Sequence, residues 1–140
     1  MKDYMAFFEG SYRRLTRDPG IRGDFIEGFY ERFLAGSPDV ARRFALTDMR
    51  RQQLMLARSL DEMARFSHDR CAPETLRRTA ERHGPGDLDI PPGLYDQWLD
   101  ALLASVREFD PECTEEVLLA WRVVLAPGIE YMRNQPRADR

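Results

Sequence analysis

Hydrophobic residues recur at helical spacing along almost the whole chain, and no segment alternates with the period of two that marks a β-strand. Short stretches rich in Gly and Pro separate the periodic segments. One segment places six large apolar residues at i, i+1, i+4, i+5, i+8 and i+9, which form one broad helical face: Phe25, Ile26, Phe29, Tyr30, Phe33 and Leu34. The pattern predicts an all-α protein of about seven helices, over residues 3–16, 22–36, 38–44, 48–65, 74–83, 91–109 and 114–133.

The expected helix boundaries carry local signals. Asp18-Pro19-Gly20 predicts a break after the first helix. Ser37-Pro38 combines an N-cap hydroxyl with a first-turn proline, and Thr47-Asp48 is a second helix start. Residues 67–73 are expected to form a loop, while Pro127-Gly128 inside the last helix is expected to kink it or remove a backbone hydrogen bond.

Composition and charge narrow the class of protein. The 140 residues are 43% hydrophobic and 32% charged, which predicts one globular domain over residues 1–140. No apolar run approaches the ~18–20 residues of a membrane span, and the acidic N-terminus does not resemble a signal peptide. The two cysteines, Cys71 and Cys113, match no disulfide framework or zinc motif, so we expect a cytoplasmic protein. A net charge of −3, with arginines scattered among acids, argues against a nucleic-acid partner.

The sequence contains no familiar catalytic motif, so the two histidines are the residues to consider as metal ligands. The chain has no nucleophile elbow, phosphate-binding loop, Cys-x-x-Cys or His-Glu-x-x-His pattern. His68 lies in the expected polar loop. His83 closes a short helix just before Gly84-Pro85-Gly86, where a neutral imidazole could bind the metal of a cofactor such as haem. A lone histidine is, however, more often a surface or core residue than a ligand.

The order and spacing of these residues resemble the globin family, and among its members bacterial single-domain haemoglobins and the haem domain of flavohaemoglobins most of all. The resemblance extends from about Tyr12 to Met132. It is carried by residues that stand in the family's order: Tyr30 in a Phe-Tyr segment, Pro38, Phe44 fourteen positions after Tyr30, Gln52, Leu56, His83, Tyr95 and the pair Ala120-Trp121.

This resemblance implies a globin fold around haem b, with His83 as the proximal metal ligand. The side chains implied to contact the haem are Phe44, Leu56, His83, Tyr95 and Leu99. Apolar stripe residues that could also line the cavity, but that are equally typical of a core, are Met55, Phe25, Phe29 and Leu60.

On the distal side, Tyr30, Gln52 and Leu56 are implied to face the bound ligand. Bound O₂ carries partial negative charge, so a tyrosine hydroxyl and a glutamine amide could each stabilise it by roughly 1 kcal/mol, whereas CO would gain less. The alternative is that Tyr30 is a core aromatic and Gln52 a helix-boundary residue.

The expected function is that of a haem globin that reversibly binds O₂, with NO or CO as further ligands. One alternative is a nitric oxide dioxygenase. That enzyme would need a separate reductase, because we expect no reductase domain in 140 residues. It would also lack the glutamate that flavohaemoglobins pair with the proximal histidine and tyrosine, because the segment Met132-Arg133-Asn134-Gln135 holds no carboxylate. The other alternative is a haem-free globin-like signalling domain. Either a monomer or a homodimer is compatible with the charge.

Overall fold

A computed structural model describes residues 3–69, 74, 77–78 and 91–134 of the chain. Within these residues all regular structure is helical, which confirms the predicted fold class. The helices are α1 (Tyr4–Arg17), α2 (Pro19–Ala35), α3 (Pro38–Arg43), α4 (Met49–Asp69), α6 (Pro92–Phe109) and α7 (Glu115–Arg133). Most of the helix expected over residues 74–83 lies outside the described part of the chain.

Short polar caps set several helix starts, as the sequence indicates. The side chains of Ser37 and Thr114 accept hydrogen bonds from the backbone N–H groups of Asp39 and Val117, at the starts of α3 and α7. Asp48 does the same before α4, because its Oδ1 accepts from the backbone N–H of Arg50 at 3.1 Å.

The break between α1 and α2 is shorter than predicted. Asp18 is the C-cap of α1 and also the N-cap of α2, and its carboxylate accepts a hydrogen bond from the Gly20 N–H at 3.0 Å. Pro19 takes the first helical position, where its missing N–H costs nothing and its fixed φ favours the helix.

The prediction of a loop over residues 67–73 is wrong for its first three positions, because α4 continues to Asp69. No Gly or Pro interrupts this stretch, and the ring of Phe66 packs edge-on against Tyr131 of α7 at 5.6 Å. This contact extends the buried face of α4 by one turn. His68 therefore lies on the last turn of α4 rather than in a loop.

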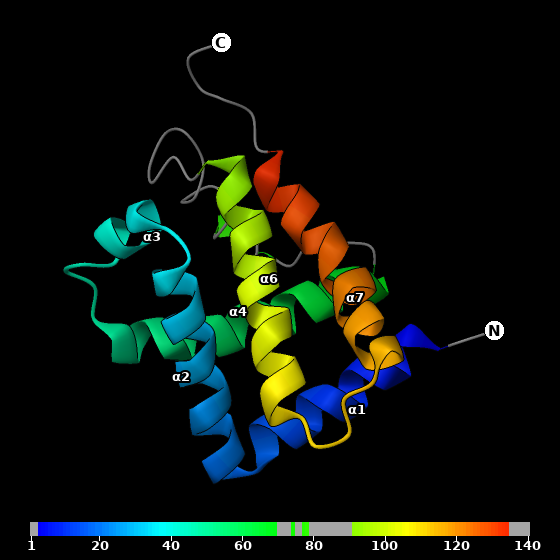
Figure 1. The fold of residues 1–140 in the computed structure, drawn as a ribbon. Coiled ribbons are helices and arrows are strands. Elements are labelled where there is room, and N and C mark those ends of the chain that lie inside the picture. Colours follow the sequence, from blue (N-terminus) through cyan, green and yellow to red (C-terminus); the bar gives the residue numbers. More distant parts are fainter. Residues whose placement is uncertain (1–2, 70–73, 75–76, 79–90, 135–140) are drawn as a thin grey trace.

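The helices cross one another in a way that brings α2, α4 and α6 around a common interior. As Figure 1 shows, α6 and α7 lie next to each other, α1 crosses below them and α4 passes behind. The main packing contacts join α2 to α6, and α7 to both α1 and α4. None of the described helices has both the length and the apolar composition to span a membrane.

Two glycines allow the closest helix crossings. A Cβ atom at Gly28 of α2 would lie 2.6 Å from Cε2 of Phe109 at the end of α6, and one at Gly128 of α7 would lie 2.6 Å from Cγ of Met63 in α4. Next to the first crossing, Oγ of Ser105 donates a 2.7 Å hydrogen bond to the Phe25 carbonyl. Helix α7 continues through Pro127 to its end at Arg133.

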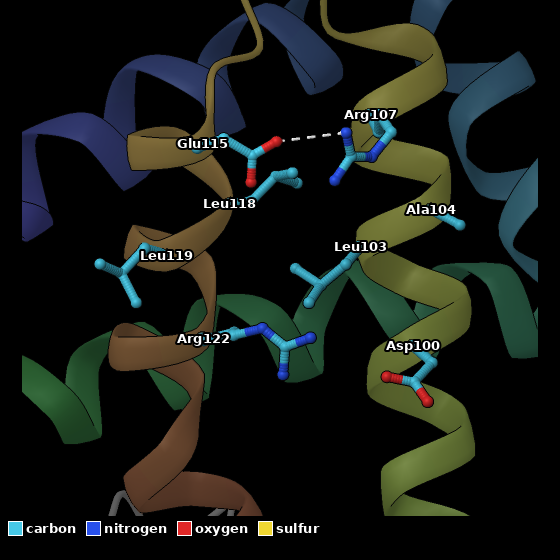
Figure 2. Close-up of a pocket in the computed structure, with 8 residues that line it drawn as sticks. All are labelled: Asp100, Leu103, Ala104, Arg107, Glu115, Leu118, Leu119 and Arg122. Carbon is cyan, nitrogen blue, oxygen red and sulfur yellow. Dashed lines mark hydrogen bonds and ion pairs between the residues drawn. The ribbon is translucent and has the colours of Figure 1, made fainter.

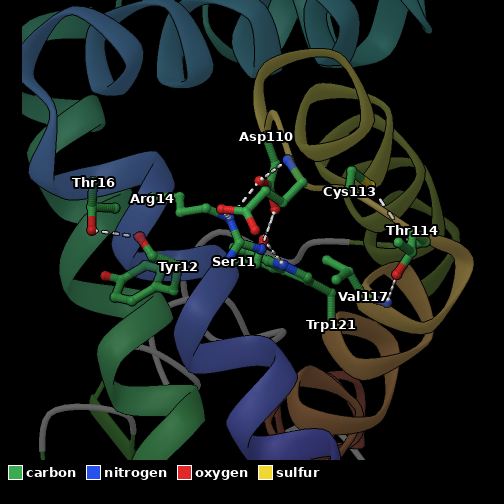
Figure 3. A network of polar contacts seen from close by, with 10 residues as sticks. Ser11, Tyr12, Arg14, Thr16, Asp110, Cys113, Thr114, Val117 and Trp121 are labelled. Atoms are coloured by element: carbon green, nitrogen blue, oxygen red, sulfur yellow. Dashed lines mark hydrogen bonds and ion pairs between the residues drawn. The ribbon is translucent and has the colours of Figure 1, made fainter.

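A buried polar network fixes α1 against the turn between α6 and α7 (Figure 3). Nε1 of Trp121 donates to Oγ of Ser11 at 2.9 Å, and that hydroxyl donates to Oδ2 of Asp110 at 2.6 Å. The Arg14 guanidinium binds both oxygens of Asp110, at 2.7 and 3.0 Å. Trp121 itself is fully buried, and Phe8 packs edge-on against it at 4.7 Å. The network thus joins three helices in the core opposite α3.

Candidate functional site

The buried face of α2 brings Tyr30 to the first turns of α4. Tyr30 is 5% exposed, and its hydroxyl donates a hydrogen bond to the backbone carbonyl of Gln52 at 3.1 Å. Burial raises the pKa of the Tyr30 hydroxyl, and the contact with Gln52 offsets part of the rise. The phenol is therefore protonated at neutral pH. The structure brings the two predicted distal residues together, but through the main chain of Gln52, whose side chain is half-buried.

Apolar side chains surround this pair. Leu56, one turn after Gln52 on α4, is buried. Phe44, just after α3, is half-buried and packs edge-on against the rings of Tyr30 at 6.3 Å and Phe33 at 6.0 Å. Phe29 adds a further edge-on contact to Tyr30 at 4.7 Å. One polar pair thus lies against an aromatic and aliphatic wall.

Tyr95 and Leu99 lie one turn apart on α6. Tyr95 is 7% exposed, and its hydroxyl has no hydrogen-bond partner among the described residues. Burial raises the pKa of Tyr95 to about 12, against the opposing effect of the positive charge on Arg133. Leu99 is half-buried and packs against the core.

Comparison with known proteins decides the family. No family model matches the chain, and no curated protein matches it either. Among solved structures, the chain resembles protein PA3967 from Pseudomonas aeruginosa PAO1, whose crystal structure is described as highly homologous in structure to a human haemoglobin. The two share 35% sequence identity and a TM-score of 0.85, over 94% of this chain and 96% of that chain. The chain belongs to the globin family.

The residues of this globin fit a haem group. A buried hydroxyl without a partner costs about 1–3 kcal/mol, and the Tyr95 hydroxyl has none among the described residues, so it is open to a contact with a bound group. The resemblance places a haem-contacting residue at this position. The apolar side chains of Phe44 and Leu56 are the kind of surface that contacts a porphyrin.

An arginine that sequence reasoning missed lies close to Tyr95. Nη2 of Arg133 binds Asp96 at 2.5 Å and Nη1 binds Glu130 at 3.3 Å, while its buried Nε has no acceptor in the described part of the globin. Glu130, the nearest acid to the expected proximal glutamate, is exposed and is paired with Arg133. The i, i+3 spacing of Glu130 and Arg133 was the available signal for their pairing.

The proposed iron ligand, His83, lies outside the described residues of this globin. The other histidine, His68, is exposed at the end of α4. Among the residues that the structure describes, no three His, Cys, Asp or Glu side chains are grouped so that they could hold a metal ion. Of the further cavity candidates, Phe25, Phe29 and Leu60 are buried, whereas Met55 is 37% exposed.

Proposed function

We propose that this globin is a bacterial single-domain haemoglobin that holds haem b and reversibly binds O₂. The observation that supports this most is the buried pairing of Tyr30 with Gln52 beside Leu56 and Phe44. A hydrogen-bonding pair in an otherwise apolar wall is typical of a site for a small polar ligand. His83 would bind the iron, and the residues that would hold the ring are Phe44, Leu56, Tyr95 and Leu99.

When bound, haem supplies the iron centre that binds diatomic gases, while the chain excludes water and donates hydrogen bonds. The Tyr30 phenol is protonated and has one hydrogen to donate, which is directed at the Gln52 carbonyl in the structure described here. Its donation to O₂ therefore competes with a bond to the main chain of α4. The amide of Gln52 is the second donor. CO, which carries little charge on its oxygen, gains less from either donor.

Nitric oxide dioxygenation has weaker support. The dioxygenase activity would be favoured by a carboxylate near Tyr95, because a carboxylate increases electron density on the proximal side. The charged group that acts on Tyr95 in the structure is instead the cation of Arg133. A cation holds electron density near itself, so Arg133 would not increase the density toward the iron as a carboxylate at that place would. We therefore propose ligand binding rather than turnover as the principal activity.

The first experiment is an absorption spectrum of the purified protein in the ferric, dithionite-reduced and air-exposed states. We expect an intense Soret band, its shift on reduction, and a persistent spectrum of the O₂ complex in air. Absence of a Soret band even after addition of haemin would instead favour the haem-free signalling domain.

Replacement of the proposed iron ligand tests the assignment directly. We expect His83→Ala to lose stable haem binding while the apoprotein stays mostly helical by circular dichroism. His68→Ala is the matched control, because His68 is exposed and lies on the last turn of α4. Normal haem stoichiometry in His83→Ala would disprove the assignment, and loss of haem in His68→Ala alone would transfer it to His68.

A further inference from the structure

The first turns of α4 carry apolar side chains on the side that faces away from the core. Of the six large hydrophobic residues that are exposed in the described part of the chain, three lie within ten residues of one another: Leu46, just before α4, and Leu54 and Met55. Leu54 is 70% exposed, whereas Leu56 and Leu60 of the same helix are buried. Exposed apolar residues that gather in this way are typical of a surface that another protein covers.

Three arginines surround Leu54 on the helix surface. Arg50, Arg51 and Arg58 stand four and three residues before it and four residues after it, which are the spacings that bring side chains together on one face of a helix. All three arginines are exposed. No aspartate or glutamate occurs in residues 49–60, so this stretch has a net charge of +3 in a chain whose net charge is −3.

These three arginines are not neutralised by the described part of the chain, because their guanidinium groups form no ion pair with another residue there. Arginines elsewhere are paired. Arg42 binds Asp39 on α3, and Arg107 binds Glu115 beside the groove between α6 and α7 (Figure 2). Neighbouring cations without a counter-charge repel one another, and a partner that brings carboxylates relieves that repulsion.

The chemistry of this surface favours a protein over a lipid or a nucleic acid. Arginine forms planar pairs of hydrogen bonds with carboxylates, and arginine and methionine are both enriched at protein interfaces. A membrane surface would take a wider apolar face, because here arginines occupy the turns before and after Leu54. A nucleic acid binds through its phosphates and would leave the central leucine without a contact.

We propose that an acidic protein docks on the basic face of α4, which consists of Arg50, Arg51, Leu54, Met55 and Arg58. The contact surface of this partner carries carboxylates around an apolar centre. The basic face lies on the reverse of the helix side that bears Gln52 and Leu56, so the partner contacts from outside the helix that lines the proposed ligand site. Docking does not depend on haem, and its failure would leave the proposed function untouched.

Binding of a short fluorescein-labelled peptide in which glutamates flank leucines, followed by fluorescence anisotropy with the full chain, tests the proposal. We expect saturable binding that weakens as the salt concentration rises from about 50 to about 300 mM, because salt screens exposed charges. Arg51→Glu should raise the dissociation constant about tenfold or more. No saturable binding by the wild type, or equal binding by Arg51→Glu, would overturn the proposal.

Arg22→Glu is the matched control for the charge reversal. Arg22 is an exposed arginine near the start of α2, and it too forms no ion pair with another described residue. This variant changes the net charge of the chain by the same amount as Arg51→Glu, so we expect it to bind the peptide as the wild type does. Equal weakening in both variants would mean that the peptide responds to net charge alone, and the assignment to α4 would be wrong.

Substitution of Leu54 tests the apolar centre. Leu54→Ser should weaken peptide binding about fivefold or more, whereas Leu54→Met keeps an apolar side chain of similar size and should bind as the wild type does. Both variants change an exposed position, and unchanged circular dichroism will establish that they fold. Unchanged binding by Leu54→Ser would contradict the proposed centre.

Vesicles of phosphatidylglycerol and a single-stranded oligonucleotide serve as competing ligands for the same surface. We expect the wild type to bind both more weakly than it binds the peptide. Tighter binding to either of them, lost in Arg51→Glu, would assign the basic face of α4 to a membrane or a nucleic acid and would overturn the proposal.

Discussion

At the residue scale, the hydroxyl of Tyr30 is the group whose removal is most informative. We expect Tyr30→Phe to speed O₂ dissociation about fivefold, because a hydrogen bond in a desolvated site contributes about 1 kcal/mol. CO dissociation should change less. Flash photolysis and stopped-flow mixing with the haem-loaded protein measure both rates, and an unchanged O₂ rate would show that the hydroxyl does not reach the ligand.

Tyr12 offers a matched control for that variant. Its hydroxyl also donates to a backbone carbonyl of α4, that of Ala57, at 3.3 Å. Tyr12→Phe therefore removes the same kind of contact with the same helix, at a position that the resemblance does not assign to the ligand. We expect O₂ dissociation from Tyr12→Phe to match the wild type. Equal acceleration in both variants would point to a general loosening of α4.

The sequence was sufficient to select Tyr30 and Gln52 as neighbours, because globin spacing relates them across two helices. It could not select which atom of Gln52 receives the hydrogen bond, since that depends on how deep α4 lies against α2. Arg133 was missed for a related reason. Its proximity to Tyr95 depends on how the start of α6 aligns with the end of α7, and no local sequence pattern encodes that alignment.

At the scale of elements, the crossing of α4 and α7 depends on the absence of a side chain at Gly128. A Cβ there would lie 2.6 Å from Cγ and 3.1 Å from Cβ of Met63, a residue that is 3% exposed. We expect Gly128→Ala to reduce the free energy of unfolding by about 1–3 kcal/mol, because the two helices must separate or Met63 must leave its rotamer. Urea denaturation measures this change.

Gly23 of α2 is the control, since a Cβ at that position meets nothing within 4 Å. Gly23→Ala should leave the protein as stable as the wild type or stabilise it by up to about 1 kcal/mol, owing to the better helix propensity of alanine. If Gly128→Ala behaved like Gly23→Ala, the close crossing would not be a constraint on the fold.

Helix starts were easier to predict than helix ends in this chain. Caps such as Ser37, Asp48 and Thr114 act through contacts within one turn, so the sequence indicates them locally. The end of α4 depends on tertiary packing, because Phe66 against Tyr131 extends the helix past the point where polar residues suggested a loop. The helix expected over residues 74–83 stays a prediction for most of its length.

At the scale of the whole molecule, the all-α class followed from periodicity, whereas the way the helices cross did not. The buried network of Ser11, Arg14, Asp110 and Trp121 is one reason. Its members come from two parts of the chain about 100 positions apart, and three of the four are polar residues of the kind that a sequence pattern assigns to solvent. A buried carboxylate selects one relative placement of α1, α6 and α7, because any other placement leaves a charge without partners in the core.

This network predicts how stability responds to acid. Burial alone would raise the pKa of Asp110, but hydrogen bonds from Arg14, Ser11 and the Glu112 backbone outweigh it, so the pKa of this carboxyl lies below its ordinary value. The carboxylate therefore contributes stability above the ordinary aspartate pKa of about 3.9, and the contribution is lost as the pH falls through the lower pKa of the folded state. We expect Asp110→Asn to cost about 2 kcal/mol at pH 7, with the gap to the wild type closing as the pH falls below about 4.

Urea denaturation of both proteins at several pH values measures that gap. Asp39→Asn is the comparison, since Asp39 is also paired with arginine, in its case with Arg42 and Arg43, but at the surface of α3. Solvent and salt screen such exposed pairs, so we expect the free energy of unfolding of this variant to match that of the wild type closely at every pH. A constant gap between Asp110→Asn and the wild type down to pH 2 would mean that the shape of the side chain, and not its charge, holds α1 against α7.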